Sequence, residues 1–341
     1  MVGKVISMFK TIESYEGESL KGKPHGKGSI IYKDKSRYVG LFNNGALEGA
    51  GTYISNDGIC IAGRWRKGNC ISGSMTSPCG VLYTGLMKQM VFHGKGMLSM
   101  LSGNIIIGNF DKGIVSGKAV MADQGKEIVK GIWENSALYG KGIVISADGD
   151  VRRGFWRNDK FNVITSNKIP EFQLKPSGKV EPVNKTDNAQ HFEGKVFFED
   201  NSYYYGDLKN NTMHGFGSYC WDDNSYFTGQ WSNNKPSGYG CLSFYSGEVL
   251  YGQWKGFKQS GYGLTVFPDG RKYIGKYKNG MMDDFGILLG NYGEIVQGEW
   301  CNDDIKGWAS IDKGDGVVIS GFLNGTVAKN DNCRIFNLNK S

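Results

Sequence analysis

A glycine flanked two residues away on either side by large apolar side chains recurs along the whole sequence. Successive glycines of this kind lie 23 residues apart, except for one interval of 22 and one of 52 residues. Positions two residues apart share one face of a β-strand, so each glycine lies between two large side chains on that face. A period in this range predicts one small supersecondary unit that is stacked many times. The repeated glycines are Gly17, Gly40, Gly63, Gly85, Gly108, Gly131, Gly154, Gly206, Gly229, Gly252, Gly275, Gly298 and Gly321.

A second strand is predicted after each of these glycines. It carries Gly-x-Gly and then an apolar residue two positions later, as in Gly238–Gly240 followed by Leu242. Asn44-Gly45 and Asp57-Gly58 are examples of the turn sequences that separate the strands. Such pairs tolerate the positive φ values that hairpin turns require. Each unit is therefore predicted to be one β-hairpin, and consecutive hairpins to form an antiparallel meander.

The fold class that follows is all-β, with about thirteen hairpins in an elongated, single-layer antiparallel sheet solenoid. The 52 glycines, 7 prolines and 13% aromatic residues fit short strands joined by tight turns. Strand twist would coil such a sheet into a trough or open superhelix. Because no second layer is expected over the aromatic face, part of that face is predicted to stay exposed for a partner.

The interval of 52 residues contains a surplus between about Asp159 and Gln190, rich in Asn, Lys, Pro, Ser and Thr. A strand-like segment, Phe192–Val196, precedes Gly206 at the usual spacing. We expect a loop inserted at a hairpin tip of an unbroken solenoid, and two repeat domains joined by a linker are the alternative. The predicted organisation is an N-terminal cap (1–14), a first repeat block (15–158), an inserted loop or linker (159–191), a second repeat block (192–326) and a C-terminal cap or tail (327–341).

The motif Tyr-x-Gly-x-Trp-x-x-Gly-x-x-x-Gly-x-Gly at this spacing resembles MORN repeats (membrane occupation and recognition nexus). The segments Tyr273–Gly280 and Phe227–Gly240 match closely, and the resemblance extends from about Tyr15 to Leu323. Some repeats depart from the pattern at a glycine or at the aromatic position. These departures are Ser72, Ala119, Arg152 and Ala309.

The resemblance implies a two-stranded hairpin per repeat and a scaffold function. Family members with kinase, methyltransferase or exchange-factor activity carry a separate catalytic domain, for which we expect no room here. Members built only of repeats act in radial-spoke heads of cilia, in cytoskeletal collars and at membrane junctions. We therefore expect a non-enzymatic, cytoplasmic protein of a ciliary, flagellar or other cytoskeletal assembly, with the other proteins of that assembly as partners.

The residues that could carry chemistry are better explained by the repeat. His25, His93 and His214 occupy the same position before Gly-x-Gly, and three repeats between the first two correspond to about 29 Å, too far to share a metal. Gly17–Lys23 begins like a phosphate-binding loop, but Pro24 replaces the required Ser or Thr. We predict no catalytic residue, no cofactor and no metal site.

Two further residue sets have simple interpretations. The pairs Asp283-Asp284 and Asp303-Asp304 form an acidic patch at the ends of hairpins, where a divalent cation is a minor alternative to a solvated turn. The seven cysteines include no Cys-x-x-Cys pair, and their number is odd, which favours free thiols in a reducing compartment. The sequence has no apolar run of about 20 residues, and we expect no secretory signal because a lysine interrupts the short apolar stretch at residues 1–10.

The net charge of +7 is unevenly distributed. Residues 1–160 hold 22 Lys and Arg against 13 Asp and Glu, a net charge of +9, whereas residues 192–341 have a net charge of −3. The alternative function is therefore a peripheral membrane adaptor whose basic N-terminal half contacts anionic phospholipid headgroups. The lysines are dispersed, so no nucleic-acid partner is predicted.

A row of aromatic residues two positions after the repeated glycines is the candidate partner groove. These rings stack between hairpins, and a partner helix or extended segment is predicted to lie on the same face. The unpaired edges of the terminal strands would permit oligomerisation. The groove residues are Trp65, Trp133, Trp156, Trp231, Trp254, Tyr277 and Trp300.

Overall fold

A computed structural model describes residues 11–123, 127–135, 137–146, 151–157, 159–163, 171–174, 180–182, 191–314, 317–324 and 328–337. All regular elements in these ranges are β-strands, which confirms the all-β class. The first sheet contains β1 (Ile12–Leu20), β2 (Lys23–Tyr32), β3 (Arg37–Asn43), β4 (Ala46–Ile54), β5 (Cys60–Arg66), β6 (Asn69–Thr76), β7 (Leu82–Lys88), β8 (Val91–Ser99), β9 (Ile105–Asp111), β10 (Ile114–Asp123), β11 (Glu127–Glu134), β12 (Ala137–Ser146), β13 (Val151–Arg157) and β14 (Lys160–Val163).

The second sheet follows the same plan after an irregular start. It contains β15 (Glu171–Leu174), β16 (Val180–Pro182), β17 (His191–Phe197), β18 (Tyr203–Lys209), β19 (Thr212–Cys220), β20 (Tyr226–Ser232), β21 (Lys235–Ser243), β22 (Val249–Lys255), β23 (Lys258–Val266), β24 (Lys272–Lys278), β25 (Met281–Leu289), β26 (Ile295–Cys301), β27 (Asp304–Asp312), β28 (Val317–Asn324) and β29 (Ala328–Asn337).

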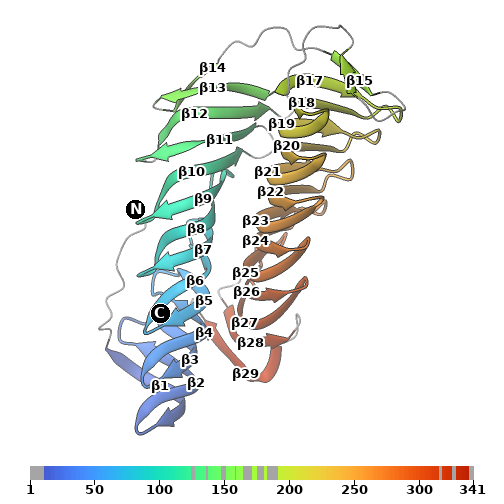
Figure 1. Cartoon of the computed structure of the whole chain (residues 1–341). Coiled ribbons are helices and arrows are strands. Elements are labelled where there is room, and N and C mark those ends of the chain that lie inside the picture. Colours follow the sequence, from blue (N-terminus) through green and yellow to red (C-terminus); the bar gives the residue numbers. More distant parts are fainter. Residues whose placement is uncertain are drawn as a thin grey trace. The chain divides into compact units, whose positions relative to one another are not determined.

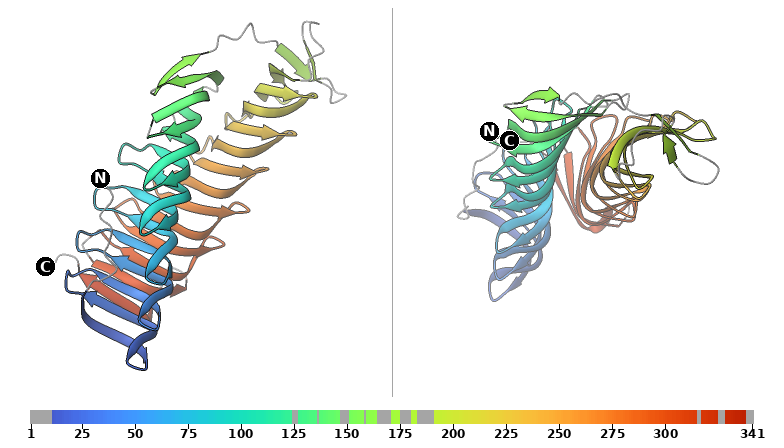
Figure 2. Two further views of the ribbon diagram at one scale, coloured as in Figure 1. Left: turned by 60° about the vertical axis from the view of Figure 1, so that its left-hand side comes forward. Right: turned by 45° about the horizontal axis from the view of Figure 1, so that its top comes forward.

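Strands that follow one another in the chain are neighbours in each sheet (Figures 1 and 2), except that β15 and not β16 lies beside β17. The hairpins β1–β2 to β13–β14 and β18–β19 to β28–β29 account for all thirteen repeated glycines. The predicted strand Phe192–Val196 lies within β17, which pairs antiparallel with β18. The serial hairpin arrangement expected from the sequence is therefore confirmed.

The hydrogen-bonded sheet is interrupted between β14 and β15, which differs from an unbroken solenoid. The interruption arises because β15 does not pair with β14. It pairs antiparallel with β16 and parallel with β17. The described strands thus form two hydrogen-bonded sheets, and the choice between an inserted loop and two repeat domains joined by a linker stays a prediction. The boundaries of the insertion and of the two caps stay predictions, since residues 1–10, 164–170, 175–179, 183–190 and 338–341 lie outside the described residues.

Within a hairpin, the aromatic ring lies flat on the glycines of both strands. A Cβ atom on Gly40 would lie 2.4 Å from the hydroxyl of Tyr38, and one on Gly51 would lie 2.2 Å from it. The Tyr38 hydroxyl donates a hydrogen bond to the carbonyl of Leu41 at 3.2 Å. The second glycine of Gly-x-Gly is therefore needed for space, as predicted. Where it is alanine (Ala119, Ala309), the residue in the ring's place is smaller: Ile106 or Val296.

The first glycine of Gly-x-Gly has a different role. Gly49 has a φ of +83° and follows a shift in strand register between Gly40 and Phe42. This shift is a β-bulge, which bends the strand and increases its twist. Equivalent glycines in other hairpins also have positive φ, for example Gly94 at +67° and Gly238 at +82°. The bulge curves each hairpin over its own aromatic rings, and the sequence analysis did not predict it.

The chain divides into two compact units, one of residues 1–115 with 269–341 and one of residues 116–268. The first unit therefore combines strands of both sheets. Within it β4 contacts β27, β5 contacts β26, and β6 contacts β25. This unit has two layers where a single layer was expected, because the face of each sheet opposite to the aromatic rings also carries residues that pack.

Candidate interaction surfaces

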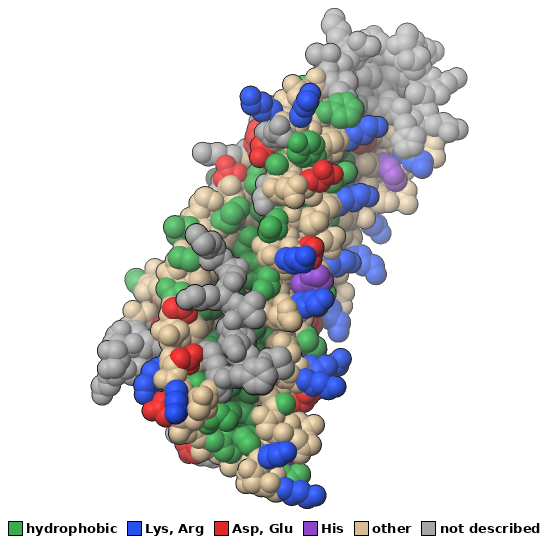
Figure 3. Space-filling view, turned by 90° about the vertical axis from the view of Figure 1, so that its left-hand side faces the viewer, with side chains coloured by type: hydrophobic (Ala, Val, Ile, Leu, Met, Phe, Trp, Pro, Cys, Tyr) green, Lys and Arg blue, Asp and Glu red, His purple; other side chains and the backbone are tan. Residues whose placement is uncertain are grey.

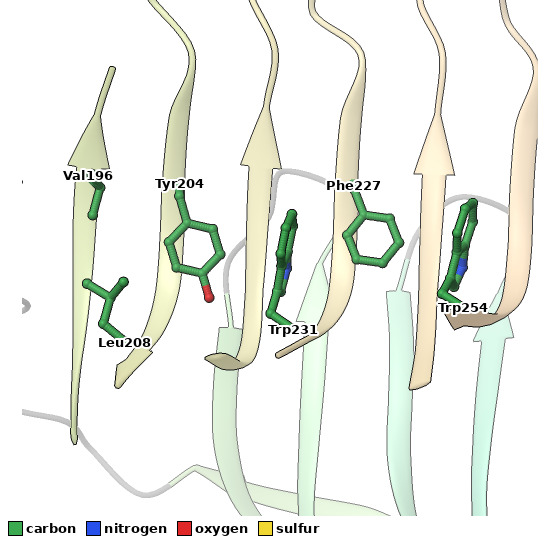
Figure 4. Packing of buried hydrophobic residues seen from close by; sticks show 6 residues of the cluster. All are labelled: Val196, Tyr204, Leu208, Phe227, Trp231 and Trp254. Carbon is green, nitrogen blue, oxygen red and sulfur yellow. The ribbon is translucent and has the colours of Figure 1, made fainter. Parts of the chain in front are cut away.

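The aromatic row forms a continuous internal cluster. In the second sheet it consists of Val196, Tyr204, Leu208, Phe227, Trp231 and Trp254, and its rings come from β18, β20 and β22 (Figure 4). The Phe227 ring lies 5.2 Å from Trp231 and 5.3 Å from Trp254, at 89° and 84°. Edge-to-face contacts of this kind stabilise aromatic pairs beyond the area that they bury.

All seven predicted groove residues are buried within this row. The indole nitrogens of Trp65, Trp231 and Trp254 each donate a hydrogen bond at 3.0 Å to the carbonyl of the second glycine of the preceding Gly-x-Gly. Rings buried to this extent offer a partner little contact area. The exposed fractions are 2% for Trp65, 7% for Trp133, 9% for Trp156, 3% for Trp231, 5% for Trp254, 7% for Tyr277 and 6% for Trp300.

The opposite face holds the two sheets of the first unit together. The Arg64 guanidinium lies 2.9 Å from a carboxylate oxygen of Glu299 and 5.8 Å from the centre of the Phe285 ring. The Thr84 hydroxyl donates to the carbonyl of Phe285 at 3.0 Å. An apolar cluster joins β3, β4 and β5 to β27 and β28. It consists of Val39, Ile54, Cys60, Trp308 and Val318.

This interface has a polar centre. The Cys60 sulfur lies 3.5 Å from the Ser310 hydroxyl, and burial raises the pKa of the thiol to about 12. Thr52, Ser74 and Gln297 are also buried here. In the described part of the chain, the hydroxyls of Thr52 and Ser74 and the side-chain oxygen of Gln297 have no hydrogen-bond partner. Their burial therefore lowers the stability of this interface.

Sequence reasoning missed this interface, although a pattern for it exists. The middle residue of Gly-x-Gly points to the face opposite to the aromatic row, and its chemistry differs between the two blocks. It is often lysine in the first block and aromatic in the second. The residues are Lys27, Lys95, Lys118 and Lys141, followed by Phe216, Tyr239, Tyr262, Phe285 and Trp308.

The second unit has contacts of the same kind. The Lys130 ammonium lies 4.4 Å from the centre of the Phe216 ring, and Arg153 forms an ion pair with Asp207 at 2.6 Å. A cation over an aromatic ring and a half-buried ion pair both favour one arrangement of the strands that carry them. Basic residues of the first block therefore meet aromatic and acidic residues of the second.

Carboxylates of the acidic patch form ion pairs with basic side chains. Asp284 replaces the first glycine of Gly-x-Gly and has a φ of +62°, a conformation that Asp tolerates better than most residues. Its carboxylate lies 2.5 Å from the Lys276 ammonium and 4.0 Å from Arg64. His93 lies 3.3 Å from Asp111. Within the described residues, no group of three His, Cys, Asp or Glu side chains could hold a metal ion.

Basic side chains are exposed at the turns between the two strands of several hairpins in the first unit. Lys21, Lys67 and Lys112 have φ values of +50°, +48° and +49°. Figure 3 shows Lys and Arg side chains interspersed with hydrophobic ones on one face of the molecule. Such a series of cations is the feature expected to attract an anionic surface. The exposed basic residues at these turns are Lys21, Lys23, Arg66, Lys67, Lys88 and Lys112.

The six cysteines with described side chains are free thiols in two different environments. Burial raises the pKa values of Cys70 and Cys241 to about 12, as it does for Cys60. Cys79 is exposed, and hydrogen bonds from the Ser77 hydroxyl and the Val81 backbone lower its pKa. Cys79 is therefore the most reactive of these thiols.

Comparison with known sequences identifies part of the repeat array. The family model described as "MORN repeat" matches residues 15–37, 38–60, 204–226, 227–249 and 251–270. A segment of 91 residues is 34% identical to mouse Alsin and covers 25% of this chain and 6% of Alsin. The same identity is found to human ALS2 C-terminal-like protein, of which 10% is covered. The chain thus corresponds to a small part of these relatives.

Solved structures give only distant similarities. The Drosophila SAS-4 (dCPAP) TCP domain, solved in complex with a proline-rich motif of Ana2, matches with a TM-score of 0.21 and 11% identity over 64% of this chain and 88% of that domain. Virginiamycin B lyase from Staphylococcus aureus matches with a TM-score of 0.14 and 11% identity over 96% of this chain and 89% of the lyase. Neither bears on fold or function. None of the described segments forms a helix that could cross a membrane.

Proposed function

Because five segments of the chain match the MORN-repeat model, we propose that it is a non-catalytic scaffold that binds other proteins of a cytoskeletal assembly. One observation carries this proposal. The repeats seal their aromatic rings inside, which leaves a rigid framework that presents exposed side chains at fixed register positions. Residues from equivalent positions of successive hairpins are spaced by two strands, or about 9.6 Å. A framework of this kind is suited to holding partners at set distances.

The assembly that we propose is a ciliary or flagellar axoneme of the radial-spoke kind, in the cytoplasm. Two observations support the proposal. Repeats make up most of both sheets, and carboxylates of the acidic patch, which was considered as a cation site, form ion pairs with basic side chains. It does not use the groove residues as anchors, because rings that are at most 9% exposed already contact their own chain. Partners are instead expected on exposed side chains of the opposite face and of the turns.

The test is to express the full chain, fused to a proximity-labelling enzyme, in ciliated cells. We expect the protein in the detergent-insoluble axonemal fraction, with labelled neighbours that are mainly structural proteins of that fraction. Recovery in the detergent-soluble fraction, with no labelled neighbours above a free-enzyme control, would contradict the scaffold function. A Trp231→Phe variant that keeps the wild-type neighbours would support the view that the buried rings are not the binding surface.

A second candidate function rests on the exposed basic turns of the first unit. Lys21, Lys67 and Lys112 lie at the turns of every second hairpin and would contact anionic headgroups together, each contributing about 1 kcal/mol near such a surface. Sedimentation with phosphatidylserine vesicles tests this alternative. We expect salt-sensitive binding that is lost in a Lys21→Glu, Lys67→Glu, Lys112→Glu variant if it holds. Equal sedimentation of that variant would exclude these turns as the contact.

A further inference from the structure

In the second unit, the strands that belong to the first sheet carry a row in which lysines alternate with apolar side chains. Lys118 on β10 is the direct register partner of Ile132 on β11, and Lys141 on β12 is the partner of Phe155 on β13. Ile132 is 38% and Phe155 45% exposed, and both lysines are exposed. We call these four residues the Lys–apolar row. It lies on the face opposite to the buried Trp133 and Trp156, because successive residues of a strand point to opposite faces.

Among the described residues, no carboxylate compensates the positive charge of this row. Burial, together with the nearby charge of Lys118, lowers the pKa of Lys130 in the adjacent row. Arg153 is neutralised by Asp207 at 2.6 Å. By contrast, among the described side chains, none of Lys118, Lys130 and Lys141 has a carboxylate within ion-pair distance. Exposed apolar groups among unpaired cations favour an anionic partner that also has apolar side chains.

We propose that the Lys–apolar row binds one face of an acidic amphipathic helix from a partner protein, an inference that rests on the scaffold function. Neighbouring strands are about 4.8 Å apart, and residues three or four apart on a helix are about 5–6 Å apart. A helix lying across β10–β13 can therefore place carboxylates on Lys118 and Lys141 and apolar side chains on Ile132 and Phe155. An extended segment fits less well, because its same-face residues are about 6.6 Å apart.

The experiment uses the full chain and a fluorescent, helical 18-residue peptide in which Glu and Leu alternate at positions i, i+4, i+7 and i+11. Fluorescence anisotropy should show salt-sensitive binding to the wild-type chain. Lys118→Glu with Lys141→Glu should weaken binding at least about tenfold, as expected for charged groups that face an opposite charge. Lys21→Glu with Lys23→Glu changes the net charge equally at a turn of the other unit. This control should bind within about twofold of the wild type, because exposed charges beyond a Debye length are screened.

The apolar half of the row is tested by Phe155→Ser. Because its ring is already 45% exposed, this change should leave the melting temperature nearly unchanged. We expect it to weaken peptide binding about tenfold by removing buried apolar area, with no change in the salt dependence. Wild-type peptide affinity in both the charge-reversal and the Phe155→Ser variants would overturn the proposal. So would loss of phosphatidylserine-vesicle binding in the charge-reversal variant without loss of peptide binding, since a membrane would then be the occupant.

Failure of the row and failure of the scaffold function give different results. If the peptide does not bind, but proximity labelling of the Lys118→Glu, Lys141→Glu variant recovers the wild-type neighbours, the row is not a binding site and the scaffold function stands. If the wild-type chain recovers no neighbours, the scaffold function is wrong. Row-dependent peptide binding together with loss of specific neighbours in the variant supports both.

Discussion

The guanidinium of Arg64 and the carboxylate of Glu299 lie 2.9 Å apart, although 235 residues separate them in the chain. Arg64 follows a repeated glycine of the first block, and Glu299 occupies the same position after a repeated glycine of the second block. Equivalent repeat positions have thus acquired opposite charges. The pair joins β5 and β26 within one compact unit.

Arg64→Ala should lower the free energy of unfolding modestly. The two side chains are 53% and 27% exposed, so solvent screening limits the pair to about 0.5 kcal/mol. A double-mutant cycle of Arg64→Ala and Glu299→Ala, measured by urea denaturation, should give a coupling energy of that size. Arg66→Ala is the matched control, since this exposed arginine lies at a turn. A coupling energy of zero for the cycle would show that the contact does not stabilise the unit.

Gly51→Ala should destabilise the chain strongly, by about 2–4 kcal/mol, because the new methyl group overlaps the Tyr38 ring. In a Tyr38→Val background the same change should cost less than about 1 kcal/mol. This expectation follows from Ala309, which occurs naturally opposite the smaller Val296. Gly256→Ala is the control: its Cβ would meet nothing within 4 Å, and its φ of +63° should cost only about 1–2 kcal/mol. Equal costs of Gly51→Ala in both backgrounds would refute the ring-over-glycine explanation.

Trp231→Phe should be more destabilising than Trp133→Phe by about 1 kcal/mol, the net value of one buried hydrogen bond. Both indoles are buried, with exposed fractions of 3% and 7%. The Trp231 nitrogen donates to the Gly217 carbonyl at 3.0 Å, whereas the buried Trp133 nitrogen has no hydrogen-bond partner in the described part of the chain. Thermal or urea unfolding of the two variants checks this order. A larger loss for Trp133→Phe would contradict it.

Cys79 should react with a maleimide or with Ellman's reagent before every other thiol whose surroundings are described. Hydrogen bonds from Ser77 and Val81 lower its pKa, so at a given pH a larger fraction is thiolate, which is the reactive form. Native Cys60, Cys70 and Cys241 should remain unmodified until the chain unfolds. Mass spectrometry of a brief reaction at pH 7.5 measures the site, and Cys79→Ser is the control. Fast modification of Cys241 in the native chain would contradict the burial of that thiol.

The chain should lose stability as the pH rises above 9. The buried thiols of Cys60, Cys70 and Cys241 have folded pKa values of about 12, against an ordinary value of 9.0. The unfolded chain therefore releases protons first, so stability is complete below pH 9 and falls as the pH approaches 12. Each thiol contributes a slope of up to about 1 kcal/mol per pH unit.

Urea denaturation between pH 8 and 9.5 measures this slope, because most tyrosines with the ordinary pKa of 10.0 are still protonated there. Cys241→Ala should reduce the slope, whereas Cys79→Ser should not reduce it, because the pKa of that thiol is lowered and not raised. A triple variant with alanine at Cys60, Cys70 and Cys241 that keeps the wild-type slope would show that other groups cause the pH dependence.

The sequence alone determined the local structure, because the space that a glycine leaves and the size of the ring that fills it both depend on residues close together in the hairpin. The spacing of Gly40, Gly49 and Gly51 is sufficient to predict a hairpin, since a ring such as Tyr38 fits only on bare backbone. The burial of the aromatic row could not be predicted in full. It depends on the bulge at Gly49, whose positive φ bends the strand over its own rings. The two extra residues that this bulge places in the second strand do not alter the repeat period.

The tertiary structure decided what lies on the other face. Residues such as Arg64 and Glu299 vary from repeat to repeat, so no period marks them, and their partners lie hundreds of residues away in the other sheet. Their contacts depend on where the first sheet ends and on which strands then pair, and local propensity contains no information about either. For the same reason, the sequence could not predict that Lys141 is exposed whereas Lys130 lies over the Phe216 ring.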